Sequence, residues 1–143
     1  MIDVERIVDI ARTYRGTRFH HHGRVKGAGV DCAGLIVCSY RDAGLEIADA
    51  RYIEADQYAL LIDTLSFDFV RIESVIGAAL GDVLVFRQTS GPVHRRIENH
   101  AGIVSSLEPL SMIHAPPMRG VVEAPVSAWF LSTTVLVFRY KGS

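Results

Sequence analysis

The chain carries a cysteine where a glycine-rich loop gives way to an apolar, helix-like run. Cys32 follows Asp31 within the segment Gly29–Leu35. A thiol at a helix start meets the positive end of the backbone dipole and free amide donors, and both favour the thiolate, which is the nucleophilic form. The backbone amide of Cys32 could also donate to an oxyanion that develops after attack. These features predict a nucleophilic cysteine.

Two histidines farther along could serve this nucleophile. His100 and His114 lie in apolar, strand-like segments joined by a short loop centred near Leu107. In a hairpin with this centre His100 faces His114 directly, and one imidazole can hydrogen-bond the other, whereas a slip by one residue separates them. The bond would fix the tautomer of His100 and leave its second nitrogen for the Cys32 sulfur. An early cysteine, a strand histidine and a polar orienting residue follow the order found in papain-like cysteine hydrolases.

The loop before Cys32 is rich in positive charge. Between residues 12 and 30 it has no Asp or Glu and four basic residues after Arg12, namely Arg15, Arg18, Arg24 and Lys26. Positive charge lowers the pKa of a thiol and attracts substrates that bear carboxylates. Each candidate alone also has a structural interpretation, because Asp31 can cap the helix and Cys32 can fill space. The prediction of catalysis depends on the combination.

Helices are expected in the first half of the chain and strands in the second. Apolar residues at helical spacing predict helices over 3–14, 31–43 and 54–65, with Gly44 closing the second. Apolar runs bounded by turn residues predict the strands, which are 83–86, 100–104, 110–115, 121–124 and 134–140. This order predicts a single α+β domain, residues 1–143, with N-terminal helices packed on a C-terminal antiparallel sheet.

Composition excludes several classes of protein. The 143 residues are 49% hydrophobic and 22% charged, which is typical of one globular domain with its own core. A net charge of -1 argues against a nucleic-acid partner. The chain shows neither a signal-peptide pattern nor a membrane-spanning stretch, so we expect synthesis in the cytoplasm and no membrane insertion. Cys32 and Cys38 lie on one expected helix at a spacing that does not permit a disulfide.

Five segments in order resemble motifs of the NlpC family of papain-like cell-wall endopeptidases, and the resemblance covers almost the full chain. Residues 16–19 and 31–35 are similar to the family's Gly-Thr-Pro-Tyr and Asp-Cys-Ser-Gly-Leu motifs. The others are its Gly-Asp strand (81–86), its His-Val-Gly-Ile strand (100–104) and the strand with its third polar residue (113–115).

This resemblance implies a papain-like, NlpC-type fold with Cys32 as nucleophile, His100 as general base and His114 as orienting residue. The implied reaction is hydrolysis of a γ-D-glutamyl–diaminopimelate or γ-D-glutamyl–lysine bond in a peptidoglycan stem peptide, without a metal or other cofactor. This would make the protein a thiol protease that degrades the cell wall.

Five residues are expected to line the substrate cleft, namely Arg18, Phe19, His21, Asp31 and Ala33. Two of them depart from the family pattern. Phe19 stands where the family has tyrosine, and Ala33 replaces the serine that often follows the nucleophile. Each departure would remove a polar group near the reaction centre.

The segment 21–27 resembles family members encoded in phage and prophage tail modules. This implies phage tail proteins as further partners and delivery to the host cell wall by the virion tail. Other functions stay open: a catalytically retired papain-like module for tail assembly or wall binding, and amidase, acyltransferase or deubiquitinase-like chemistry by the same residues. A zinc site formed by His20, His22 and Cys32 with His100 or His114 lacks the usual ligand spacing.

Overall fold

The computed structural model describes residues 2–49, 57–88 and 98–142. Its helices are α1 (Val4–Arg12), α2 (Cys32–Asp42), α3 (Gln57–Asp68), η1 (Val75–Gly77, a 3-10 helix) and α4 (Ala128–Leu131). A six-stranded antiparallel sheet has the order β3 (Phe69–Ile72), β8 (Thr134–Tyr140), β4 (Val83–Gln88), β5 (Glu98–Leu107), β6 (Leu110–His114) and β7 (Val122–Pro125). The short strands β1 (Arg24–Val25) and β2 (Gly29–Val30) pair within the loop before α2. The predicted α+β class is confirmed.

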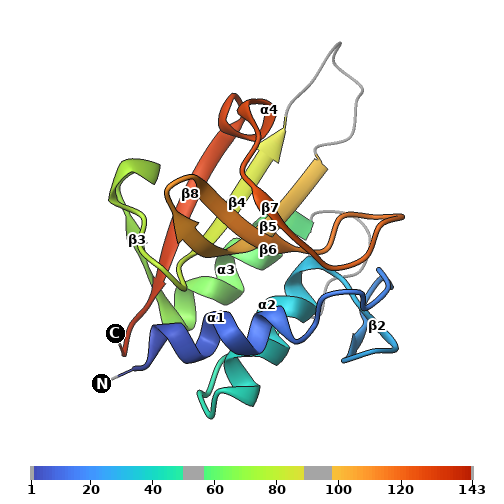
Figure 1. Ribbon diagram of the computed structural model, residues 1–143. Coiled ribbons are helices and arrows are strands. Elements are labelled where there is room, and N and C mark those ends of the chain that lie inside the picture. The colour runs from blue at the N-terminus through green and yellow to red at the C-terminus, as the bar shows by residue number, and fades with distance from the viewer. Residues whose placement is uncertain (1, 50–56, 89–97, 143) are drawn as a thin grey trace.

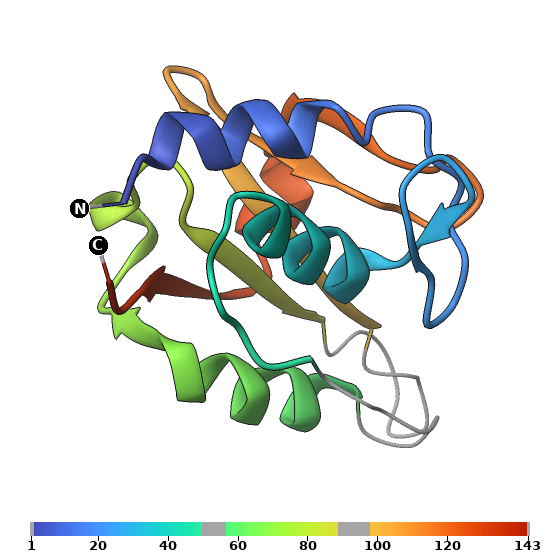
Figure 2. The ribbon, with the colours of Figure 1, turned by 90° about the horizontal axis from the view of Figure 1, so that it is seen from below.

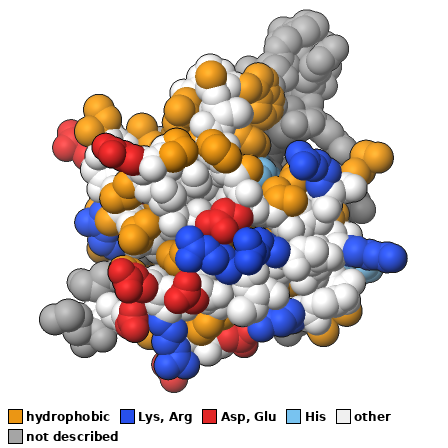
Figure 3. Space-filling view, viewed as in Figure 1, with side chains coloured by type: hydrophobic (Ala, Val, Ile, Leu, Met, Phe, Trp, Pro, Cys, Tyr) orange, Lys and Arg blue, Asp and Glu red, His pale blue; other side chains and the backbone are white. Residues whose placement is uncertain are grey.

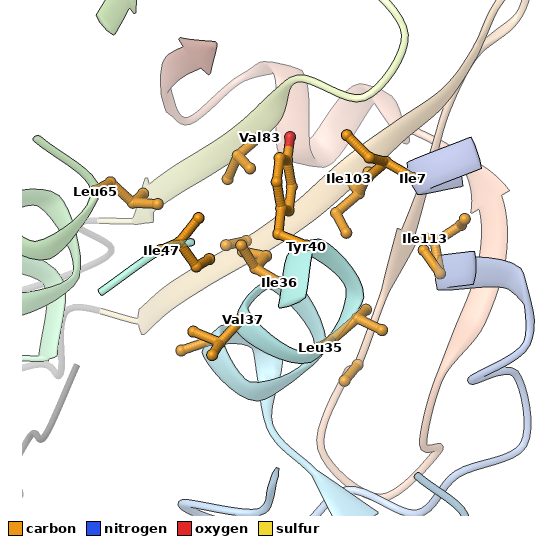
Figure 4. Close-up of a cluster of buried hydrophobic side chains, with 14 of the residues drawn as sticks. Ile7, Leu35, Ile36, Val37, Tyr40, Ile47, Leu65, Val83, Ile103 and Ile113 are labelled. Atoms are coloured by element: carbon orange, nitrogen blue, oxygen red, sulfur yellow. The ribbon is translucent and has the colours of Figure 1, made fainter. Parts of the chain in front are cut away.

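The sheet is covered on both faces. Helices α1, α2 and α3 pack on one face, as Figures 1 and 2 show, and form the larger core cluster with it (Figure 4). The other face carries a smaller cluster, against which Phe130 of α4 packs. Successive residues of β4 alternate between the two clusters, with Val83 and Val85 in the larger and Leu84 and Phe86 in the smaller. Burial on both faces explains why the first four residues of β4, 83–86, are all apolar.

Helix α2 begins at the predicted position. Asp31 is its N-cap, and the Asp31 carboxylate accepts a hydrogen bond from the Gly34 amide at 2.7 Å. At the other end Gly44 follows the C-cap with φ +86°, a conformation that favours glycine. Cys32 is therefore the first residue of the helix.

Some elements differ from the predictions. Helix α3 spans 57–68, where 54–65 was expected, and residues 54–56 lie outside the described residues. The strand β3 and the short helices η1 and α4 were not predicted. In the described parts of the chain, no helix has the length and apolar character needed to cross a membrane.

Candidate active site

The Cys32 thiol lies next to strand β5. Cys32 is partly exposed at the start of α2, and its sulfur interacts with the backbone amides of Ala33 and Ala101. Ala101 directly follows His100 in β5. The fold thus brings the cysteine to the strand that carries the first candidate histidine.

The two histidines are directly hydrogen-bonded. His100 Nε2 lies 2.6 Å from His114 Nδ1, and the ring planes meet at 78°. The predicted register is wrong, however, because His114 pairs with Gly102 rather than with His100. The strands turn between Leu107 and Leu110, and the register shifts again between residues 104 and 106. The observed pairing differs from the predicted one by two residues. Because side chains alternate between faces with a period of two, both rings still lie on the same face of the sheet.

Gly102 makes room for this contact. A Cβ atom there would lie 2.7 Å from the Met112 sulfur and 3.2 Å from the Cβ of His114. Both separations are shorter than van der Waals contact allows. Glycine at position 102 therefore lets His114 pack closely on β5 and reach His100.

Two phenylalanines enclose the histidine pair. Phe86 lies opposite His100 in the β4–β5 pairing, and their rings are 6.4 Å apart. The Phe130 ring lies 5.3 Å from the His100 ring at 16° and 5.9 Å from the His114 ring at 87°. Sequence reasoning missed Phe130 because its helix has four residues, which is too short for a periodic pattern. The available signal was Ser127, an N-cap residue type that precedes a short apolar run.

The surroundings of the Cys32 sulfur favour the neutral thiol, whereas the sequence predicted a thiolate. Desolvation of the sulfur and, to a smaller extent, the negative charge of Asp31 raise the pKa of the thiol to about 12. The amides of Ala33 and Ala101 and the charge of Arg24 act in the opposite direction with smaller effects. The effect of burial on the pKa of the thiol is therefore larger than the opposite effect of the helix N-terminus.

Three of the four basic residues of the loop contact groups other than the Cys32 thiol. The Arg24 guanidinium donates to Asp31 at 2.9 Å and to Asp49 at 2.9 Å. Arg15 forms an ion pair with Glu123 at 3.6 Å. The Lys26 ammonium lies 4.8 Å from the centre of the Tyr14 ring, in cation–π contact. Much of the positive charge that the sequence places before the cysteine is thus directed to carboxylates and an aromatic ring.

Both histidines are neutral near pH 7. Burial and, to a smaller extent, the neighbouring His114 lower the pKa of His100 to about 3. Burial and the charge of Arg119 lower the pKa of His114 to about 4. Figure 3 shows only small areas of histidine surface on its face of the molecule. In a neutral pair, one ring donates its proton to the unprotonated nitrogen of the other.

We expect these histidines to make the fold sensitive to mild acid. Histidine in an unfolded chain binds a proton near pH 6.5, whereas the folded protein binds it only near pH 4 or below. Between these values the unfolded state holds more protons, so stability falls as the pH falls. Urea unfolding at pH 7 and pH 5 should show a loss of about 1 to 2 kcal/mol per histidine.

Two variants separate this effect from other titrations. His114→Gln should reduce the loss of stability between pH 7 and pH 5, whereas His21→Gln should leave it unchanged because His21 is exposed. Equal stability of the unsubstituted protein at the two pH values would contradict burial of neutral histidines.

Asp31 and Ala33 do not line a cleft, contrary to prediction. Asp31 is buried, and its carboxylate accepts hydrogen bonds from the amides of His22 and Gly34 and from the Arg24 guanidinium. This carboxylate anchors the loop to the helix. Ala33 is 2% exposed and belongs to the larger core cluster. An alanine suits that position because its small apolar side chain is buried.

The other three predicted cleft residues lie in the loop before α2. Phe19 is partly buried and packs against the larger core cluster, as Cys32 does, and it forms a parallel bridge with Val30. Arg18 and His21 are exposed, and the His21 ring stacks on His22 at 4.0 Å. Within the described residues, no group of three or more His, Cys, Asp or Glu side chains is arranged to hold a metal ion.

Known proteins resemble this chain in sequence and fold. Residues 16–139 match the model of the NlpC/P60 family. A comparison with curated proteins finds no significant match. Among solved structures, NlpC1 from Trichomonas vaginalis is similar with 19% identity and a TM-score of 0.70 over 98% of this chain and 46% of that one.

Two further structures show the same fold. A lipoprotein-like NLP/P60-family protein from Staphylococcus aureus is 22% identical, with a TM-score of 0.64 over 96% of this chain and 41% of that one. The NlpC/p60 domain of the peptidoglycan hydrolase SagA is 25% identical, with a TM-score of 0.62 over 95% of this chain and 98% of that domain. The chain therefore spans less than half of the first two proteins and nearly all of the SagA domain.

Proposed function

Because the chain belongs to the NlpC/P60 family, we propose that it is a cysteine peptidase that hydrolyses peptidoglycan stem peptides. Members of this family are generally peptidoglycan-hydrolysing cysteine peptidases, and SagA is a peptidoglycan hydrolase. One observation carries the assignment to this site: His100, hydrogen-bonded to His114 of β6, precedes Ala101 in β5, and the Ala101 amide meets the Cys32 sulfur. The proposed bond is γ-D-glutamyl–diaminopimelate or γ-D-glutamyl–lysine.

Because the Cys32 thiol and both histidines start neutral, each step of the proposed reaction includes a proton transfer through His100. Cys32 attacks the scissile carbonyl while His100 takes the thiol proton, so a carbon–sulfur bond forms and the carbonyl oxygen becomes an oxyanion. His100 then protonates the leaving amine as the carbon–nitrogen bond breaks. Water attacks the thioester with His100 as base and restores the free thiol. The amides of Ala33 and Ala101 stabilise negative charge on the sulfur before attack is complete.

The hydrogen bond between the rings selects the tautomer. His100 must keep its Nδ1 unprotonated to accept the thiol proton, so its Nε2 carries the hydrogen and donates to His114 Nδ1. His114 in turn carries its own hydrogen on Nε2. His114 thereby orients the His100 ring and accepts from the imidazolium that forms during attack.

The direct test is digestion of purified sacculi. We expect the protein to release soluble fragments whose mass shows cleavage after γ-D-glutamate, and iodoacetamide treatment should stop the release. Cleavage at a lactyl–alanine bond would instead indicate amidase chemistry by the same residues. Release that survives full alkylation of Cys32 would contradict a cysteine mechanism.

A catalytically retired module is the second candidate, favoured by the raised pKa of the Cys32 thiol. A retired site should alkylate slowly across neutral pH and bind sacculi without releasing fragments. An active site should alkylate faster than Cys38, because His100 can take the proton as the sulfur reacts. The ratio of the two alkylation rates, read by peptide mass, separates the candidates.

We also propose that the protein acts as part of a phage or prophage tail. The support is the resemblance of the segment 21–27 to tail-module members of the family. Mass spectrometry of purified virions, induced from a host that carries the gene, tests the proposal by finding the protein in the particle or only in the lysate.

A further inference from the structure

We infer that Phe130 of α4 is a positioning residue that holds the His100–His114 pair in the orientation that serves Cys32. The inference rests on the proposed function and adds to it an element outside the cysteine and the two histidines. It concerns the face of the sheet opposite to α1, α2 and α3, where the smaller core cluster lies.

The contacts of Phe130 are directed at both rings. Its ring lies nearly parallel to the His100 ring, 5.3 Å away, and nearly perpendicular to the His114 ring, 5.9 Å away. The Phe130 ring also packs on the Phe86 ring, with the ring centres 4.7 Å apart. Offset-parallel and edge-to-face arrangements are the preferred geometries of aromatic rings. Phe130 thus restricts rotation of both imidazoles, and Phe86 packs against Phe130.

Helix α4 is built to present this side chain. The Ser127 hydroxyl caps the Phe130 amide at 3.2 Å, and the Thr133 hydroxyl donates to the Phe130 carbonyl at 2.6 Å. The neighbours Trp129 and Leu131 are 50% and 43% exposed, whereas Phe130 is partly buried. These two hydrogen bonds therefore fix the backbone amide and the backbone carbonyl of Phe130.

A neutral histidine pair needs such support. A carboxylate partner would hold the imidazole through a charge-assisted hydrogen bond, which is roughly twice as strong as a neutral one. His114 offers only a neutral nitrogen, and the terminal torsion of a histidine side chain is broad. Packing must then supply the orientation that charge does not. Phe130 contacts both rings and is placed to supply it.

Among the residues that the structure describes, few charged or titratable groups act on the pair. His114 faces His100 from β6, the Cys32 thiol lies beside the next residue of β5, and Arg119 acts on His114 from the loop after β6. Strand β4 presents Phe86, and α4 contributes no titratable side chain. A change at position 130 therefore alters the surroundings of the pair without removing a charge.

The test compares three substitutions at position 130 with Leu131→Ala on the same helix. Phe130→Ala should lower kcat on a wall peptide about tenfold and leave KM within about twofold, the scale of one aromatic contact. Water would then reach His100 and raise its pKa, so the acid limb of the kcat profile should move to higher pH. Phe130→Leu keeps an apolar side chain over the histidines, so it should lower kcat without moving the acid limb of the profile. Phe130→Tyr keeps the aromatic ring, so both kcat and the acid limb should stay as in the unsubstituted protein.

A second measurement does not depend on activity. In the Cys32→Ala background, ¹⁵N NMR of the His100 ring should show one fixed tautomer, and Phe130→Ala should convert it to a mixture. If the unsubstituted protein cleaves no wall substrate, the proposed function fails while the NMR result still decides the role of Phe130. If Phe130→Ala does not fold, Phe130→Leu carries the comparison. Phe130 variants that match Leu131→Ala in kcat, pH profile and tautomer would overturn the inference.

Discussion

Alanine in place of Cys32 should lower kcat on a wall peptide at least about 10⁴-fold, because no other residue of the site can form the thioester. Unfolding by urea should change by no more than about 1 kcal/mol, because the side chain is partly exposed and small. Fragment release from sacculi, followed by mass spectrometry, measures the first effect.

Cys38→Ala is the matched control. Cys38 lies on the same helix, and its thiol donates to the Arg24 carbonyl at 3.3 Å, away from the histidine pair. Its kcat should stay within about twofold of the unsubstituted protein, since it loses one weak hydrogen bond. Residual hydrolysis by Cys32→Ala, or an equal loss in both variants, would rule out Cys32 as the nucleophile.

Gly34→Ala should destabilise the protein by more than about 3 kcal/mol, against the ordinary trend for this exchange. Alanine inside a helix is normally more stable than glycine by roughly 0.5–1 kcal/mol. At this position, however, a Cβ atom would lie 2.1 Å from the Gly23 carbonyl oxygen and 2.8 Å from Arg24 Nη1. The loop must move away, which also breaks the partly buried hydrogen bonds that Asp31 accepts from the His22 amide and the Arg24 guanidinium. The midpoint of urea unfolding measures the effect.

Gly77→Ala is the control for the general effect of replacing a glycine by alanine. A Cβ atom there meets only the end of the Ile72 side chain, at 3.3 Å, so the change should stay within about 1 kcal/mol. The activity of Gly34→Ala should also fall, because the displaced loop leads directly into Cys32 at the start of α2. A Gly34→Ala protein as stable as Gly77→Ala would mean that the loop does not dock on α2 as described.

Local signals were sufficient for most of the fold. Asp31 and Gly44 mark the ends of α2 because an N-cap and a left-handed C′ residue act within one turn of helix. The run 134–140 is long and apolar, and its bounds were predicted correctly. Strand β3 was missed because its four residues follow α3 without a turn residue and depend on pairing with β8.

The site needed information that no local pattern contains. The alternation of side chains along a hairpin was enough to place both histidines on one face of the sheet. Their exact register, however, depended on an irregularity near Ser105. The basic residues before Cys32 predict a lowered thiol pKa, but the sequence does not show that Arg24 is committed to Asp31 and Asp49. Burial, which dominates that pKa, is a property of the packed chain.

The two outermost strands of the sheet, β3 and β7, have four residues each. Pro125 ends β7, and its Glu123 is held by the Arg12 guanidinium at 3.1 Å. Short edge strands, a proline that lacks an amide hydrogen and a charged side chain on the edge all hinder the pairing of another chain with the sheet. Copies of this protein should therefore resist edge-to-edge aggregation at high concentration.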